Sequence, residues 1–269
     1  MIDPKVFAEL MNRGIITNVG LNPEDYADMN DLQRYGLATA IGADEEYTEI
    51  ISSMSVIEQF LSAVAKGGKV DVPADLELTA PVIITKDVTI NLNGKNIEAG
   101  LFTESNGEIL EGETDSYVFW VKGGTLTIEG EGMVKAKDAD YSMAVWANGG
   151  KVVINGGNYM NGGLGCDLMY ASAGGNIEIN DGVFFPSYGG DASHTAQPHN
   201  ALNVKDKDYK SGASSIVVKG GRFLKFNPAD NKSEGPNTSY VAEGFTAVAD
   251  GEWYVVEEQR DIVVDEGAE

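Results

Sequence analysis

Short stretches of alternating apolar and polar residues recur along the middle of the chain, and each is followed by glycine. Four such units are GGTLTIEG at 123, GGKVVINGG at 149, GGNIEINDG at 174 and ASSIVVKGG at 213. A period of two is typical of β-strands with one buried face. The apolar pairs are Leu126/Ile128, Val152/Ile154, Ile177/Ile179 and Ile216/Val218, and the residues between them, expected to face outward, are Thr127, Val153, Glu178 and Val217.

The spacing of these units predicts a stacked repeat. They lie 26, 25 and 39 residues apart. The first two spacings match one turn of a parallel β-helix, and the third matches a turn with an insertion of about 14 residues. Glycines after each strand supply the positive φ that a sharp corner requires, and two further short strands complete each turn. We therefore expect an all-β fold, a right-handed parallel β-helix of roughly six turns between 67 and 256.

The ends of such a stack expose strand edges and core, and they need caps. The capping box at 55–58, helically spaced apolar residues and Gly67 predict a capping helix over 55–66. This divides the chain into three parts: a helical docking segment at 1–52, the β-helix at 53–256 with its capping helix, and an acidic tail at 257–269.

The segment 1–52 lacks the repeat and is too short for a core of ordinary size. Asp3-Pro4 and Asn22-Pro23 carry the signals that start two short amphipathic helices. Their apolar side chains need a partner surface. The residues expected to attach this segment to another protein are Val6, Phe7, Leu10, Met11, Tyr26, Met29 and Leu32.

The net charge, the cysteine count and the lack of long apolar stretches limit the partners and compartments that we expect. The chain has 269 residues, 42 acidic and 19 basic, and a net charge of −23, which repels nucleic acid phosphates. One cysteine, Cys166, excludes an intrachain disulfide. The N-terminal residues lack the pattern of a signal peptide, and no stretch approaches 18 apolar residues. We expect a soluble protein from a reducing compartment, with no nucleic acid partner and no membrane insertion.

Candidate chemistry is sparse. His194 and His199 lie in the insertion at 186–213, and their spacing is interpreted as a solvated loop and not as a metal site. Glycan hydrolysis requires two carboxylates about 5–10 Å apart. The pairs considered are Asp138/Asp140, in a corner loop, and Asp167/Asp181, separated by one strand and a corner. Neither is assigned a catalytic role, and no cofactor or metal is expected.

Aromatic residues lie in the strand that precedes each of the repeated units, and they have two interpretations. If Tyr117, Trp120, Trp146 and Tyr170 face outward, they can stack on sugars or pack on a neighbouring subunit, and the pattern does not decide their direction. A partly apolar outer face needs cover, which favours self-association. The residues expected at the interface between subunits are Val153, Val217, Trp120 and Trp146.

The series SVIEQFLSAVAKGGKVDVPADLELTAPVIITKDVTINLNGKNI, VWANGGKVVINGG and YVAEGFTAVADGEWYVV resembles pectate-lyase-like β-helix modules of phage virion fibres and of gut-bacterial surface proteins. The resemblance covers about 53–256. The plan of a short helical N-terminus before a β-helix is similar to head-fibre or capsid-decoration proteins of tailed phages that infect gut Bacteroidetes. No catalytic motif of the family is present to carry over.

The resemblance implies a structural virion protein on the outer capsid surface, made in the host cytoplasm. Residues 1–52 would bind capsid proteins, and the β-helix would project and contact host-surface glycans. Parallel β-helix fibres of this kind pack around a three-fold axis, so we favour a homotrimer over a dimer. The alternatives are a tailspike-like polysaccharide depolymerase and a bacterial glycan-binding adhesin.

Overall fold

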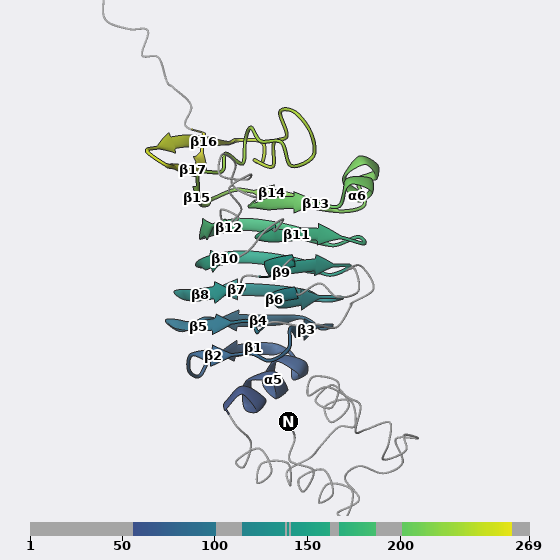
Figure 1. Cartoon of the computed structure of the whole chain (residues 1–269), viewed down its shortest axis with the longest axis vertical. Helices are drawn as coiled ribbons and strands as arrows, with labels where there is room; N and C mark the ends of the chain where they lie inside the picture. Colours follow the sequence, from purple (N-terminus) through teal and green to yellow (C-terminus); the bar gives the residue numbers. More distant parts are fainter. Residues whose placement is uncertain are drawn as a thin grey trace, which may run out of the picture.

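The chain folds as stacked layers of short strands, capped by a helix. A computed structural model describes residues 56–100, 115–137, 139, 141–161, 167–186 and 201–259. Over these residues the fold is all-β, with two helices, α5 (Val56–Lys66) and α6 (Asp206–Ser211). The layers follow one another along the long axis of the molecule (Figure 1). The expected attachment residues of 1–52, Cys166, both histidines, Asp138, Asp140 and residues 260–269 lie outside the described residues.

The first ladder contains the alternating strands that the sequence predicts. All of its strands pair in parallel, each with the strand one layer away. Its members are β1 (Gly68–Asp71), β4 (Val88–Asn91), β7 (Thr125–Glu129), the first half of β10 (Lys151–Met160), the first half of β12 (Asn176–Phe185) and β14 (Ser215–Val218). The expected inward pairs are confirmed, because all eight side chains are at most 5% exposed.

Two further ladders complete each layer. The second consists of β2 (Leu76–Glu77), β5 (Lys95–Glu98), β8 (Gly132–Lys135), the second halves of β10 and β12, and β15 (Gly221–Leu224). The third, a separate five-stranded sheet, consists of β3 (Val82–Ile84), β6 (Asp115–Val121), β9 (Tyr141–Asn148), β11 (Met169–Ser172) and β13 (Leu202–Val204). The main apolar core lies between the ladders.

Glycine corners connect the first ladder to the second. Gly130 and Gly157 have φ of 83° and 87°, a conformation that side chains with a Cβ adopt at a cost. The corner also brings adjacent layers into backbone contact, since a Cβ on Gly156 would lie 3.1 Å from the Gly130 carbonyl oxygen. The positive φ that the sequence predicted at the corners is confirmed, and the structure adds a requirement for space between adjacent layers.

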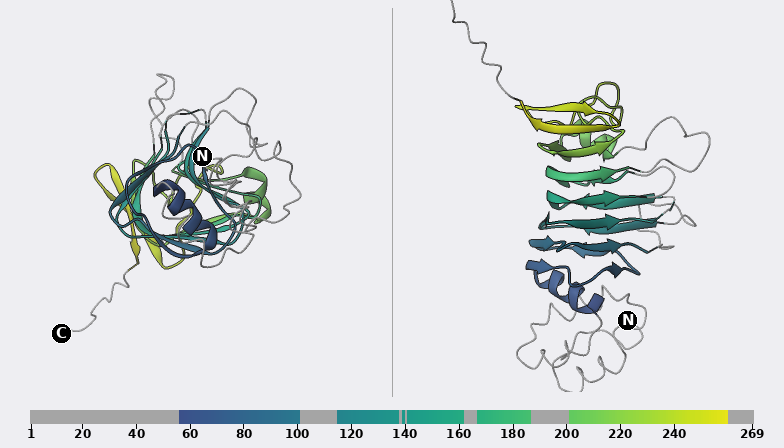
Figure 2. Two further views of the ribbon diagram at one scale, coloured as in Figure 1. Left: turned by 90° about the horizontal axis from the view of Figure 1, so that it is seen from below. Right: turned by 90° about the vertical axis from the view of Figure 1, so that its left-hand side faces the viewer.

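The two ends of the stack are closed differently. At the N-terminal end, α5 forms where a capping helix was expected and buries Phe60, Leu61 and Val64 against the first layer (Figure 2). At the other end, β16 (Phe245–Asp250) and β17 (Trp253–Glu258) form an antiparallel hairpin, and β17 pairs with β15. A helix covers one end, whereas the edge of a sheet ends the other.

Candidate functional site

The outward row of the first ladder mixes charge with the expected apolar residues. Val153 and Val217 are half-buried on the outer face, and Glu178 lies between them in register. The Glu178 carboxylate accepts a hydrogen bond from Lys219 Nζ at 3.0 Å and lies 3.6 Å from Lys151 Nζ. The hydrogen bond from Lys219 is the main reason that the Glu178 pKa is lowered. This face is therefore not a continuous apolar patch, and an interface there remains a prediction.

The indoles expected at the subunit interface are buried within the single chain. Trp120 is 9% exposed and Trp146 is 1% exposed, and they pack with Tyr117 and Met143 in a second apolar cluster, separate from the main core. Trp146 Nε1 donates a hydrogen bond to Ser172 Oγ at 2.9 Å. Neither indole is available to a sugar ring or to a second subunit, so the expectation for Trp120 and Trp146 is corrected.

The burial of these indoles follows from a break in the alternation. In β9, Ala144 and Val145 both pack in the main core, while Met143 and Trp146 on either side of them lie in the second cluster. The N–H groups of Ala144 and Val145 both donate to the Leu168 carbonyl, at 3.0 and 3.3 Å, which is the pattern of a β-bulge. Because the strand is apolar on both faces, a period-two analysis could not assign Trp146.

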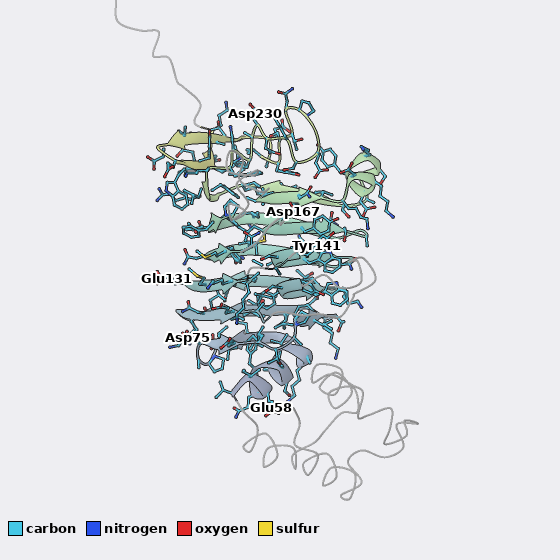
Figure 3. All side chains as sticks on the ribbon, in the orientation of Figure 1. Glu58, Asp75, Glu131, Tyr141, Asp167 and Asp230 are labelled. Carbon is cyan, nitrogen blue, oxygen red and sulfur yellow. The ribbon has the colours of Figure 1, made fainter. Side chains whose placement is uncertain are left out.

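A groove of about 570 Å³ lies along the glycine corners of four successive layers. Six of its eleven lining residues are glycine, so much of the lining is backbone. Its polar side chains are Glu131, Asn155, Asn158 and Asp181; Glu131 is at the left edge of the stack in Figure 3. Such a groove offers carbonyl, amide and carboxylate groups to a ligand rich in hydroxyls. The sequence indicated these corners as turns and gave no signal for a groove.

Part of this polar set is held in place by neighbouring layers. Asn158 Nδ2 donates to the Gly132 carbonyl oxygen at 3.0 Å. Asn180 Nδ2 donates to Asn155 Oδ1 at 2.9 Å, which links the two corners. These bonds fix the direction of each amide, so the hydrogen-bonding groups of the groove are pre-oriented.

Half-buried aromatic residues lie on the outer face of the second ladder and of the hairpin that follows it. Val183 lines the groove, and its register partner Arg222 lies 5.3 Å from the ring centre of Trp253. Trp253 also contacts Phe185 edge to face, with 5.3 Å between ring centroids. The sequence analysis missed Phe185 and Trp253, which are both half-buried; of the four aromatic residues that it named, Tyr170 is also half-buried and the other three are buried.

A polar cluster closes the exposed edge of β13. Glu234 Oε1 accepts hydrogen bonds from Val204 N–H at 2.6 Å and from the Tyr240 hydroxyl at 2.8 Å. Ser233 Oγ donates to the Leu202 carbonyl oxygen at 2.8 Å. Burial raises the pKa of Glu234, and burial together with this carboxylate raises the pKa of Tyr240. The side chains of Glu234 and Ser233 therefore bind backbone groups of β13 that a further strand of the sheet would otherwise bind.

The carboxylates considered for hydrolysis have separate surroundings. Asp181 lines the groove. Asp167 precedes β11 in the third ladder and accepts a hydrogen bond from Asn203 Nδ2 at 2.7 Å. The two therefore belong to different faces, and the geometry supplies no shared site for this pair.

Comparisons with protein-family models, with curated proteins and with solved structures found no match. Within the described ranges, no cluster of three or more histidine, cysteine, aspartate or glutamate residues is arranged to hold a metal ion. Neither of the two described helices has the length and apolar character needed to cross a membrane.

Proposed function

We propose that the stacked layers are turns of a right-handed parallel β-helix. Two observations support this: each of the first five layers contributes one strand to each of three ladders, and all neighbouring strands from β1 to β15 pair in parallel. A chain that visits three ladders in turn and rises by one strand spacing, about 4.8 Å, describes a helical path.

We further propose that the protein is a structural component of a tailed-phage virion, a head fibre or capsid-decoration protein on the outer surface. The observation that carries this proposal is the elongated stack that begins at a capping helix, directly after a segment with its own apolar residues (Figure 1). Such a body has the form of a rigid projection attached by one end. Its acidic charge suits the outside of a capsid better than the surface that faces DNA.

Contact with host-surface glycans is part of this proposal. The groove along the glycine corners has fixed amides and exposed carboxylates, and Phe185 belongs to the strand that supplies Val183 to the groove and contacts Trp253. Hydroxyl-rich ligands require this combination of polar groups and apolar ring surface. The assembly state remains a prediction: the resemblance favours a homotrimer, and a dimer is the second choice.

The test of attachment compares the full chain with a variant that starts at Ser53. Both are added to particles of the phage whose genome carries the gene, after deletion of that gene, and sedimented with them. We expect the full chain to sediment with the particles and the shortened chain to stay in the supernatant. The circular dichroism spectrum of the shortened chain should still show the β-sheet signal of the stacked layers. Retained binding of the shortened chain would refute attachment through 1–52.

A genomic observation bears on the same proposal. Genes for capsid and portal proteins beside this gene are expected. A position among genes for polysaccharide degradation, together with release of oligosaccharides from a host glycan, would favour the depolymerase instead.

A further inference from the structure

The hairpin at the C-terminal end leaves one strand edge open. The sheet order ends β15-β17-β16, so β16 has a strand neighbour on one side only within the described residues. Figure 1 shows β16 at the end of the stack, beyond β17. Its open edge therefore points along the axis, away from the other layers.

The hydrogen-bond pattern identifies the groups on this edge. Gln259 N–H donates to the Gly244 carbonyl at 2.7 Å, so these residues form a hydrogen-bonded antiparallel pair. Such pairs alternate along the strands, which directs Thr246, Val248 and Asp250 toward β17. Ala247 and Ala249 therefore direct their N–H and C=O groups to the open edge.

The side chains of β16 do not protect this edge. Proteins commonly protect edge strands with lysine, proline or a bulge. β16 has only one charged residue, Asp250, at its end. Val248 is 44% exposed and is one of three large apolar residues with such exposure among those described. An edge of this kind fits another β-strand.

We propose that the edge pairs with β16 of a second copy of this chain, antiparallel about a two-fold axis at Val248. Ala247 then exchanges two hydrogen bonds with Ala249 of the partner subunit, and the symmetric pair does the same. This register uses both N–H groups and both carbonyls of Ala247 and Ala249 on each strand. The two sheets become one sheet that crosses the dimer.

Neighbouring registers are less favourable. An axis at Ala247 would need the N–H of Phe245, which already donates to the Ala242 carbonyl at 3.1 Å. An axis at Ala249 would place Val248 opposite Asp250 of the partner subunit. With the axis at Val248, the two valines face each other, and the Thr246 hydroxyl can donate to Asp250 of the partner subunit.

The first experiment traps the pair. In a Cys166→Ser background, Val248→Cys places two thiols opposite each other in a non-hydrogen-bonded pair, whose Cα atoms are about 4.5 Å apart and suit a disulfide. We expect most of the full-length chain to form a covalent dimer on mild oxidation. The matched control, Ala247→Cys, has no thiol opposite it and is expected to stay uncrosslinked. Equal crosslinking of both variants, or none of Val248→Cys, would overturn the proposal.

The second experiment blocks the edge. Ala249→Pro removes an N–H that faces away from β17, so the hairpin keeps its own bonds. Light scattering should fall from twice the 28.7 kDa chain mass to that mass. Val248→Lys should do the same if the proline variant folds poorly. An unchanged mass of two or three chains in a folded edge variant would place the contact elsewhere.

A third variant distinguishes a second copy of the chain from the chain's own C-terminal residues as the occupant of the edge. Residues 260–269 contain Ile262, Val263 and Val264, which could add a strand to β16. Ending the chain at Gln259 should leave crosslinking through Val248→Cys unchanged. If crosslinking appears only after this truncation, the tail occupies the edge and the dimer proposal is wrong. None of these readouts depends on a phage particle, so their failure is separate from failure of the proposed function.

Discussion

Trp120 and Trp146 stack face to face across β6 and β9, with ring centroids 5.1 Å apart and 7° between the ring planes. Tyr117 packs edge-on against both rings. The two indoles are register partners in adjacent layers, so the stack of strands also produces a stack of side chains. This second cluster joins layers on the outer side of the third ladder, where the main core cannot reach.

Replacement of Trp146 by alanine should therefore destabilise the fold strongly. The change removes a buried indole, its stacking partner contact and its hydrogen bond to Ser172, and large-to-small changes of this type cost about 3–5 kcal/mol. Urea unfolding followed by circular dichroism measures the loss. Val153→Ala, on a half-buried outer row, is the control and should cost less than about 1 kcal/mol. Equal losses would mean that the indole cluster adds no stability.

Substitutions at two adjacent glycines can distinguish the need for a positive φ from the need for space between layers. Gly174 has a φ of 87°, with open space where a Cβ would lie. A Cβ on Gly175 would overlap the Ala147 carbonyl group of the neighbouring layer. Gly174→Ala should cost about 1–2 kcal/mol from backbone strain. Gly175→Ala should cost more, because two layers must move apart, and thermal unfolding of both variants tests this order.

The carboxyl group of Glu234 should make stability depend on pH. Burial raises its pKa above the usual 4.5, while the bonds from Val204 and Tyr240 oppose this shift. The native state then binds the proton more tightly than the unfolded state. The resulting stability is complete below the unfolded pKa and is lost as pH rises through the folded pKa.

Glu234→Gln tests this prediction, because the amide oxygen can still accept both hydrogen bonds. We expect the free energy of unfolding of the variant to increase relative to that of the native chain as the pH rises from 4 to 8. Nearby Asp206 raises the Glu234 pKa and Lys210 lowers it, so Lys210→Met should enlarge the difference. Parallel pH profiles for Glu234→Gln and the native chain would contradict the assignment.

The first ladder was predictable because buried apolar residues alternate with less buried residues along its strands. Ile154 and Ile179 are buried and Val153 and Glu178 lie on the outer row, as the alternation indicated. The third ladder was not predictable in the same way. Its strands are apolar on both faces and interrupted by a bulge, so nothing in the local sequence shows which side Trp146 occupies.

The candidate surfaces depend on contacts between distant residues, which a single sequence does not contain. The groove exists because corners from four layers align, and each corner alone is an ordinary turn. Phe185 and Trp253 meet only when the hairpin returns antiparallel onto β15. The burial of Glu234 likewise depends on a loop that closes the edge of β13.

The proposed role in a virion is tested most directly by immunogold electron microscopy of intact particles produced from the genome that carries this gene. The antibody is raised against the stacked body, residues 56–259. We expect label on the outside of the capsid in native particles and none on particles from a strain in which the gene is deleted. Unlabelled native particles that also lack the chain by mass spectrometry would contradict a structural role in the virion.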